Sequence, residues 1–449
     1  MLNIQSETND AVPSNGMPAF LLAFDPDVDA HFCTAALETY AFARRESVVI
    51  DALSLIAAVE FADRSFARSS MGWARRIELS VPVYDPRRWQ SPGVLARLHE
   101  ALRFLSGDFW SIKFVKRQGN PLPKPQDTLP MPVNVKAVLA YSDGLDSRAV
   151  ANLAAASGEN VLKVRVGSKA SAGSTFNGKP EAFTGIPYEL RHTRPRLESS
   201  ARSRGFKFAF IGGIAAYLVD TSTVLVPESG QGIFGPAMLP LAHAYADFRN
   251  HPVFLSRIEN LLFELVGHKV QFEYPRIWRT KAETLSDYVE SSSENKWADT
   301  RSCWQDSRWC SFEGKRRQCG ICAACMLRRM SVKSAGLSES NDTYICEDLT
   351  ASSIEQCVVP GFTHLGKSFR EYAIAGVLQL DQFAELGRES SKGSIHRHSV
   401  LTSYPLKLSV GETEQNLTSL VQRHANEWSA FINDLGSQSF LRQWTGVYI

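Results

Sequence analysis

Residues 140–150, "AYSDGLDSRAV", join an apolar run to an Ala-rich segment through a short turn of small and acidic residues. The run from Val135 to Tyr141 predicts a β-strand, and a helix is expected to begin near Asp146, so residues 142–147 occupy the turn between them. In a parallel α/β sheet, ligands bind at the carboxyl ends of the strands. Small residues there let backbone N–H groups close on an anion, and the helix N-terminus adds a partial positive charge. The turn is a candidate phosphate site, although Asp146 and Ser147 also suit an ordinary capped helix.

The region from residue 134 to about residue 340 alternates between strand-like and helix-like segments. Its strand-like segments are "VNVKAVLAY" (133–141), "NVLKVRVG" (160–167) and "STVLVPES" (222–229), and "SRAVANLAAAS" (147–157) is the first helical segment. Alternating βα units predict a parallel sheet with helices on both faces. The expected fold class is therefore α/β.

The pattern differs on either side of this region. Short helical and strand-like segments precede it, a proline-rich stretch joins them to it, and long helical periodicity follows it. The predicted organisation is a flexible tail (1–17), an N-terminal α+β domain (18–120), a proline-rich linker (121–133), the α/β domain (134–340) and a helical C-terminal extension (341–449).

The composition is that of a globular protein without bulk attraction for polyanions. The 449 residues are 44% hydrophobic, and the formal net charge is +2. Such a small charge does not support nucleic-acid binding by overall attraction, so any basic binding surface must be local. The first residues lack the basic and apolar runs of a secretory signal. The longest apolar run, Phe208–Val219, is shorter than the roughly 20 residues of a membrane span, so we expect a cytoplasmic protein.

Five of the eight cysteines crowd into residues 303–325, whereas Cys33, Cys346 and Cys357 are scattered. The segment "QCGICAACMLRR" (318–329) has CxxCxxC spacing, which is typical of a metal site rather than of a disulfide framework. Tetrahedral zinc needs a fourth soft ligand, and either Cys303 or Cys310 can supply it. An iron–sulfur cluster and free thiols are the alternatives. The candidate ligands are Cys303, Cys310, Cys319, Cys322 and Cys325.

In its strand-to-helix context, "SDGLDS" (142–147) resembles the "SGGLDS" phosphate loop of the PP-loop ATP pyrophosphatase superfamily, with Asp143 in place of the second glycine. The resemblance implies that ATP is cleaved between its α and β phosphates, with AMP passing to a substrate oxygen, and that Mg²⁺ assists. It also implies that backbone groups at the end of the second strand hold the adenine. The nucleotide-binding residues implied are Ser142, Asp143, Gly144, Leu145, Asp146, Ser147, Val164 and Val166.

The loop and the cysteine segment together resemble the 7-cyano-7-deazaguanine synthase family, over residues 134–340. In that family a "TxSC" string carries the first cysteine, which matches Cys303 and makes residues 304–310 an insertion, whereas the family's spacing to the second cysteine matches Cys310. Weaker matches are "RTKAETL" (279–285), "RSRGFKFAFIGGIAAYLV" (202–219) and the arginine after the last cysteine. The residues implied are Asp146, Ser147, Lys281 and Arg328 for catalysis, and Arg204, Glu228 and Gln231 for a purine-like substrate.

The flanking regions narrow this resemblance further. A synthase-like core behind an extra N-terminal domain most resembles the synthase-like proteins of Qat anti-phage defence systems. The resemblance implies adenylation of a 7-carboxy-7-deazaguanine-like carboxylate and attack by an amine, giving an amide, a nitrile or a deazaguanine-modified partner protein. We therefore expect a 7-deazaguanine substrate, ATP, Mg²⁺ and structural Zn²⁺, a protein partner in a defence complex, and no membrane association.

Two other classes of function stay open. An RNA-modifying PP-loop enzyme is one, because residues 191–207 carry five arginines, a histidine and a lysine that suit a phosphate track. A non-catalytic nucleotide-binding scaffold is the other, if Asp143 disables hydrolysis. Glu228 also has the simpler interpretation of an ordinary loop acid. Residues 394–399, "SIHRHS", lie near no cysteine or acidic cluster and are expected to form a solvent-exposed loop rather than a metal site.

Overall fold

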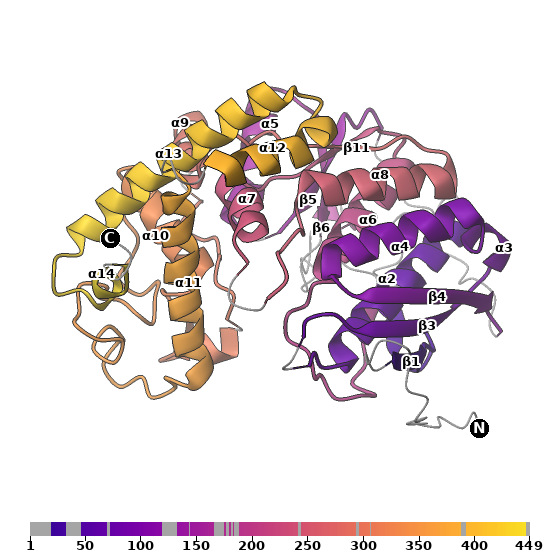
Figure 1. The fold of residues 1–449 in the computed structure, drawn as a ribbon, viewed down its shortest axis with the longest axis horizontal. Coiled ribbons are helices and arrows are strands. Elements are labelled where there is room, and N and C mark those ends of the chain that lie inside the picture. The colour runs from indigo at the N-terminus through magenta and orange to yellow at the C-terminus, as the bar shows by residue number, and fades with distance from the viewer. Residues whose placement is uncertain are drawn as a thin grey trace.

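The computed structural model describes residues 19–32, 46–69, 72–118, 133–142, 144–165, 175–176, 179–180, 183, 188–240, 244–292, 296–305, 307–387 and 392–445. The predicted tail at 1–17 and all but the last residue of the predicted linker at 121–133 lie outside these residues, as do Asp143 and Val166. A parallel sheet lies at one end of the molecule, a second parallel sheet lies in the middle, and helices with the cysteine segment form the other end (Figure 1).

The central sheet has the strand order β11-β10-β5-β6, and each of its three pairings is parallel. Its strands are β5 (Ala137–Tyr141), β6 (Val161–Arg165), β10 (Thr223–Leu225) and β11 (Gln271–Glu273). The helices around it are α5 (Leu145–Ala156), α6 (Arg204–Leu218), α7 (Gly230–Met238), α8 (Pro252–Val266) and α9 (Lys281–Ser291).

Alternate residues of these strands are buried on opposite faces of the sheet. Val138, Val164 and Val224 pack into a core with α6 and α8, whereas Leu139 and Leu225 pack against α5. The chain passes from β5 through α5 to β6, on one side of β5, and then through α6 to β10, on the other side of β5. Crossovers of the same hand that run in opposite directions place their helices on opposite faces of the sheet. The predicted α/β class with a parallel sheet is therefore confirmed, and the sheet is compatible with a PP-loop fold.

The N-terminal sheet is also parallel, with the order β1-β3-β4. Its elements are β1 (Ala19–Ala23), α2 (Ser47–Ser65), β3 (Arg76–Val83), α3 (Pro86–Trp89), α4 (Pro92–Ser106) and β4 (Phe109–Lys116), while β2 (Ala30–Phe32) pairs with β9 (Tyr188–Leu190) and β7 (Thr175–Phe176) with β8 (Lys179–Pro180). We expected an α+β arrangement here. The arrangement is α/β instead, because the chain crosses from β3 to β4 through α4, and such a crossover makes neighbouring strands parallel.

The N-terminal region shares its hydrophobic core with the central sheet. α2 is hydrophobic around most of its circumference and is buried between β3 on one side and α6 on the other, while α4 packs on α8. One continuous cluster of buried side chains runs from Leu22 to Phe272 through these elements. Burial of such a surface is the main favourable term in folding, so the two regions stabilise each other.

Charged residues of α2 and the N-terminal sheet form a buried cluster in which each carboxylate oxygen of Asp63 and Asp108 is bonded, although Arg68 Nε lacks a hydrogen-bond partner. Arg75 donates to Asp63 at 2.6 Å and to Asp108 at 2.7 Å, and Arg68 donates to both oxygens of Asp108 at 2.6 and 2.9 Å. The second oxygen of Asp63 accepts from the backbone of Ser203, which precedes α6. These bonds compensate the cost of removing the charges from water.

The chain beyond the central sheet is mainly helical. Its elements are η2 (Ser307–Cys310), β12 (Ser311–Phe312), β13 (Lys315–Arg316), α10 (Ala323–Ser334), α11 (Lys367–Glu385), α12 (Lys392–Leu406), α13 (Val410–Asp434) and α14 (Phe440–Thr445). α13 runs along the top of the view in Figure 1 and packs on α10, α11 and α12. Near the cysteine segment, Cys346 and Cys357 form a disulfide.

The "SIHRHS" segment does not form the solvent-exposed loop that we predicted. It lies within α12, where His398 is buried and its Nε2 is 2.9 Å from Nε2 of buried His251. Burial lowers the pKa of both histidines, His398 to about 4, which keeps the pair neutral. Neutral imidazoles pack between aromatic rings, among them Phe234, so these histidines are core residues.

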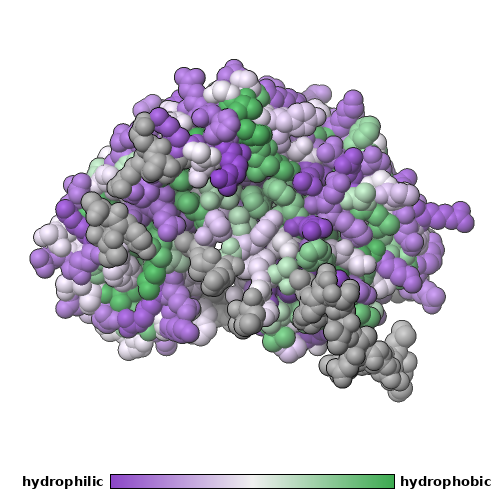
Figure 2. All heavy atoms as spheres, viewed as in Figure 1, coloured by the Kyte–Doolittle hydropathy of each residue, from purple (hydrophilic) through white to green (hydrophobic). Residues whose placement is uncertain are grey.

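The face of the molecule seen in Figure 2 is mostly hydrophilic. Figure 2 shows polar side chains over much of the face viewed, with hydrophobic ones gathered in a strip at its upper middle. None of the helices in the described part of the chain has the length and apolar character that a membrane span requires.

Candidate functional site

The turn after β5 is held by its own two serines. Ser147 Oγ donates to the carbonyl of Ser142 at 2.8 Å and accepts from the N–H of Ser142 at 3.2 Å. Ser142 Oγ in turn accepts from the N–H of Gly144, the N-cap of α5, at 3.2 Å. A Cβ at Gly144 would lie 3.1 Å from Ser142 Oγ, so glycine gives the turn its room. Ser147 is buried, and its described contacts are those of a residue that shapes the loop.

Asp146 and Lys281 meet beside this turn. Asp146 lies in the first turn of α5, and Lys281 is the first residue of α9, where Thr280 and Glu283 form a capping box. Lys281 Nζ donates to Asp146 Oδ2, and both side chains are largely buried. The other oxygen, Asp146 Oδ1, is buried without a hydrogen-bond partner. An unpaired buried carboxylate oxygen beside an anion-binding turn is a suitable ligand for Mg²⁺, whose preferred ligands are carboxylate oxygens.

Glu228 lies next to this pair. Burial, followed by the charge of Asp146, raises the pKa of Glu228 to about 7, while the charges of Lys281 and Arg249 lower it. A Cβ at Gly232 would lie 2.2 Å from Glu228 Oε1, so this glycine lets the carboxylate fold back over the start of α7. The backbone N–H of Ser229 bonds its carboxylate, and Asn250 lies at 3.5 Å. Glu228 can therefore still accept hydrogen bonds from a ligand.

Arg204 lies at the start of α6, over the ring of Phe208. Its side chain is exposed, yet protein surrounds it closely enough for desolvation, and then the charge of Arg249, to lower its pKa. Arg249 pairs with Asp247 at 2.6 Å and also influences Glu228, so a chain of charged groups connects Arg204 to the turn. Arg204 is thus available to an anion near the site.

The sequence interpretation missed the contribution of the N-terminal region to this charged chain. Glu60 of α2 accepts from Lys207 at 2.9 Å and from Tyr188 at 2.7 Å, and it pairs with Arg64. Cations outnumber carboxylates in the neighbourhood, where Arg64, Arg202, Arg204, Lys207 and Arg249 face Glu60 and Asp247. Helical periodicity around residue 60 gave no sign that its charged residues contact α6, because that contact depends on tertiary packing.

Gln231, which we predicted to contact a purine-like substrate, is held by three protein groups. It is 4% exposed, and its amide bonds the N–H of Lys281 at 2.7 Å, His424 at 3.0 Å and Glu427 at 3.1 Å. These protein partners use both amide hydrogens and one lone pair of the oxygen, so the amide has no hydrogen left to donate to a ligand. Gln231 instead joins α7, α9 and α13.

The predicted adenine contacts are placed only in part. Val164 is fully buried in β6, so only its backbone can contact a ligand. Among the described strands β6 is at the edge of the sheet, where backbone groups of the outer side are not used by a neighbouring strand. The N–H of the next residue, Arg165, is taken by the carbonyl of Phe183 at 2.9 Å.

Four cysteine sulfurs come together in the cysteine segment. The sulfurs of Cys303, Cys319, Cys322 and Cys325 all lie within 4.8 Å of one another. Backbone N–H groups of Cys319 and Cys322 donate to neighbouring sulfurs, at 3.2 and 3.3 Å. Four converging sulfurs with supporting N–H groups suit a tetrahedral zinc ion with no open position, and they can also hold an iron–sulfur cluster. Cys310 is outside this group of four.

Cys310 nevertheless lies beside the group. Hydrogen bonding, first with Cys310 and then with the other three, lowers the pKa of Cys303, whereas burial raises the pKa of Cys325. Four buried thiols cannot all ionise without a cation to compensate their charge. A divalent metal would supply that compensation. The disulfide lies next to the group, because the N–H of Cys346 donates to the carbonyl of Cys319 at 3.0 Å.

Arg328, for which we predicted a catalytic role, bonds other parts of the protein through all three of its nitrogens. It is fully buried, its Nε donates to Glu339 at 2.7 Å, and its other nitrogens donate to Thr300 and to the carbonyls of Trp297 and Ala298. Every donor group is engaged, so the guanidinium has no donor left for a phosphate. Arg328 holds residues 297–300, the segment that leads to Cys303.

The cysteine segment lies beside the turn after β5, which is named the phosphate turn after its predicted ligand. The carbonyl of Arg301 lies 3.9 Å from the position of a Cβ at Gly144. Arg148 of α5 donates to the carbonyl of Lys296 at 2.6 Å, and Leu145, Trp297 and residues of α9 and α10 share one small core. The four converging sulfurs therefore belong to a segment that borders the turn.

Part of the chain matches a known family. A family model described as "Queuosine biosynthesis protein QueC" matches residues 236–336, which contain Lys281, Arg328 and the four converging cysteines. Comparison with curated proteins and with solved structures found no match. The family match supports a QueC-like assignment and indicates an ATP-dependent function of the synthase or ligase type.

Proposed function

We propose that the protein adenylates a 7-carboxy-7-deazaguanine-like carboxylate with ATP and passes the activated acyl group to an amine. The observation that carries the proposal is the Asp146–Lys281 pair beside the serine-bonded turn, with one carboxylate oxygen left unbonded. The family match around Lys281 and the cysteines supports it. In this proposal the N–H groups of the turn bind the phosphates, Asp146 holds Mg²⁺, and Mg²⁺ neutralises phosphate charge.

The reaction follows from what each group can do. A carboxylate oxygen of the substrate attacks the α phosphorus, the bond from that phosphorus to the bridging oxygen breaks, and pyrophosphate leaves. Lys281 offsets negative charge that moves to the leaving group. The amine then attacks the acyl carbon, AMP leaves and the nitrogen loses a proton, which gives an amide. A second adenylation, on the amide oxygen, followed by loss of AMP and a proton, would give a nitrile.

Two groups near the turn have the chemistry to hold the substrate. Glu228 can accept from the amide and amine N–H groups of a guanine-like edge, because its described protein partners, the backbone of Ser229 and Asn250, do not use all the acceptor sites of a carboxylate. Arg204, supported by Arg249, can bind the carboxylate of the same molecule. Positioning of this kind, with charge neutralisation, supplies most of the catalysis in phosphoryl and nucleotidyl transfer.

We further propose that the acceptor is an amine on a protein partner, in a defence complex of the Qat type. The support is the extra structure around the QueC-like residues, since α2 contributes Glu60 and Arg64 to the charged groups near Arg204. Ammonia is the alternative acceptor. Intact-mass measurement of a co-purified partner distinguishes them, because transfer to protein adds the mass of the base and transfer to ammonia does not.

Release of pyrophosphate tests the adenylation. The purified protein is incubated with ATP and Mg²⁺, with and without 7-carboxy-7-deazaguanine, beside Asp146→Ala and the control Glu290→Ala, which removes an exposed acid at the far end of α9. We expect release that needs the substrate and Asp146 and that Glu290→Ala leaves unchanged. ATP binding without release would instead favour the nucleotide-binding scaffold.

An RNA-modifying enzyme remains the second candidate, on one observation. Arg191 and Arg196 are exposed on the segment before α6. Two other members of the predicted phosphate track are engaged elsewhere, because Arg202 pairs with Asp247 and Lys207 with Glu60. Binding of tRNA that weakens steeply with salt would favour this candidate.

A further inference from the structure

A chain of buried polar groups connects α13 to the backbone of Lys281. Gln231 of α7 is at its centre, with Lys281 on one side and His424 and Glu427 of α13 on the other. Glu427 also accepts from Thr280 Oγ1 at 2.6 Å. All five residues lie outside the phosphate turn, and the two from α13 lie outside the QueC-like match.

The direction of each hydrogen bond follows from its partners. The carbonyl of Leu380 accepts from His424 Nε2 at 2.8 Å, so His424 Nδ1 is the acceptor for the amide of Gln231. The second amide hydrogen of Gln231 goes to Glu427, an acceptor. The amide oxygen then faces the N–H of Lys281. No other orientation of the Gln231 amide satisfies all three neighbours.

The same face of α13 also bonds the residues around Lys281. Arg423 donates to the carbonyl of Trp278 at 2.6 Å and pairs with Glu283 at 2.9 Å. Glu283 belongs to the capping box of α9, whose Thr280 also bonds Glu427. Packing is equally tight, since a Cβ at Gly230 would lie 2.1 Å from the carbonyl of Ile277 and 2.5 Å from Leu420 of α13.

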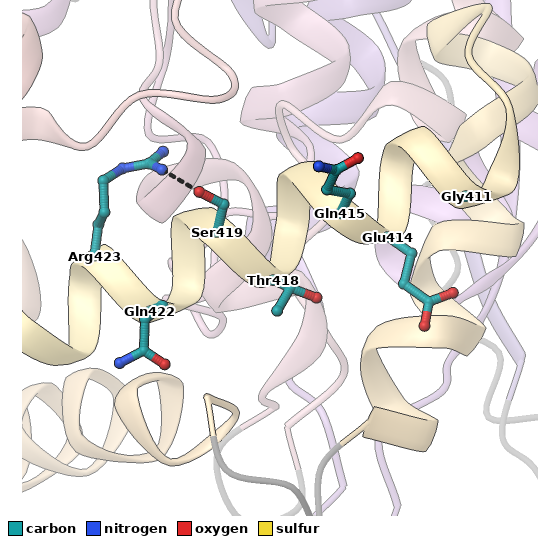
Figure 3. A pocket seen from close by; sticks show the side chains of 7 residues that line it. All are labelled: Gly411, Glu414, Gln415, Thr418, Ser419, Gln422 and Arg423. Atoms are coloured by element: carbon teal, nitrogen blue, oxygen red, sulfur yellow. Dashed lines mark hydrogen bonds between the residues drawn. The ribbon is translucent and has the colours of Figure 1, made fainter.

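The polar surface of α13 that borders Arg423 has a different character. Figure 3 shows a pocket there, lined by Gly411, Glu414, Gln415, Thr418, Ser419, Gln422 and Arg423. Only Arg423 of these residues takes part in the contacts with α9. Glu414 contacts His396 of α12 and is partly exposed, so it offers a control position on the same helix.

We propose that α13 belongs to the catalytic centre, with Glu427 and His424 as positioning residues that hold Lys281 against Asp146 through Gln231 and Thr280. The inference rests on the proposed function for what Lys281 does, but not for how Lys281 is held. The long side chain of a lysine starts from its backbone, so the position of that backbone controls where the ammonium group lies. A displacement of about 1 Å in a positioned group can cost on the order of 100-fold in rate.

Variants of Glu427 separate positioning from packing. Glu427→Met fills the space but cannot accept a hydrogen bond from Gln231 or Thr280. Glu427→Gln keeps one acceptor for Gln231, and its amide can donate to Thr280 Oγ1. Burial raises the pKa of Glu427 to about 7, so a neutral side chain of the same shape is close to the native state. Glu414→Gln is the matched control on α13.

Two readouts are needed. We expect Glu427→Met to lower kcat for substrate-dependent pyrophosphate release about 10- to 100-fold, with a smaller change in KM for ATP. Glu427→Gln is expected to retain most of the activity. In parallel, modification of Lys281 by a lysine-specific reagent, followed on its peptide by mass spectrometry, should be several-fold faster in Glu427→Met, because the ammonium is less well held.

The outcomes separate the two proposals. If the unaltered protein releases no pyrophosphate, the adenylation is wrong, and the labelling rate of Lys281 still tests the inference about α13. If Glu427→Met labels and reacts like the unaltered protein, or if Glu427→Gln is as impaired as Glu427→Met, the positioning role is overturned. Should Glu427→Met not fold, Thr280→Val and Thr280→Ser take its place, since only serine keeps the hydroxyl that bonds Glu427.

Discussion

Two groups of buried charged residues in this chain differ in how many of their carboxylate oxygens have hydrogen-bond partners. In the N-terminal region, each carboxylate oxygen of Asp63 and Asp108 accepts from Arg68, Arg75 or a backbone N–H, at distances near 2.6–2.9 Å. Beside the phosphate turn, Asp146 uses one oxygen for Lys281 and leaves the other unbonded. Charges that stabilise the fold are completed within the protein, and charges that await a ligand are not.

The first prediction extends the comparison to the cysteine segment, where only a bound cation can compensate the negative charge of the thiolates. Cys319→Ser is expected to reduce bound zinc from about one ion per chain to a small fraction, and to lower the thermal midpoint by many degrees, because structural zinc contributes directly to folding. Cys310→Ser should keep its zinc, since Cys310 lies outside the group of four. Metal content by mass spectrometry, with melting curves, checks both. Equal loss in the two variants would contradict the assignment.

The second prediction concerns the completed cluster. Asp108→Ala leaves Arg68 and Arg75 buried without their shared partner, and we expect it to lower the free energy of unfolding by about 3–5 kcal/mol. Denaturant unfolding measures this. Glu100→Ala, which removes an exposed ion pair with Arg97, is the control and should change the free energy by less than about 1 kcal/mol. A small effect of Asp108→Ala would remove the distinction drawn above.

The third prediction concerns the incomplete pair. Asp146→Asn should lower pyrophosphate release by at least about 100-fold, because it removes the charge that holds the cation. Its cost in stability should be smaller than that of Asp108→Ala. Without the charge of Asp146, the pKa of Glu228 falls and its carboxylate compensates Lys281. Activity and denaturant unfolding are measured on the same preparation, and a stability loss as large as that of Asp108→Ala would argue that the pair is structural.

The fourth prediction uses the raised pKa of Glu228. A carboxyl group with a pKa of about 7 is ionised only above that pH, and only the ionised form accepts from two donors of a guanine-like edge. Affinity for 7-carboxy-7-deazaguanine should therefore fall about tenfold between pH 8 and pH 6. Glu228→Gln should bind more weakly and lose this pH dependence. Calorimetric titration across the range decides, and an unchanged pH profile in Glu228→Gln would assign the effect to another group.

Local sequence patterns predicted the central part of this structure well. The apolar run before residue 142 and the small residues after it predict a strand, a turn and a helix, and the structure has β5, the turn and α5 in that order. Lys281 was predicted as a site residue because the short string "RTKAETL" resembles a segment of the family. The structure then brings it to Asp146, 135 residues away.

The predictions for Gln231, His398 and Arg328 were made from local sequence, whereas the environment of each residue is made by distant parts of the chain. Gln231 follows a glutamate in a plausible ligand loop, but its partner Glu427 is 196 residues further on. His398 has a polar local sequence, and it is buried because His251, 147 residues earlier, lies against it. Arg328 stands where the family places a charge, yet Glu339 and the carbonyls of residues 297–300 use all of its donors.

The distance in sequence between Lys281 and α13 has a consequence for synthesis of the chain. Strands β5 and β10, the phosphate turn and Lys281 itself leave the ribosome well before Thr280 can meet Glu427, which is 147 residues later. At translation rates of about 5–20 residues per second, that interval is roughly 7–30 s. A nascent chain can therefore carry a folded phosphate turn while its lysine is still loosely held. Competence to activate a substrate would be acquired only after α13 has been translated.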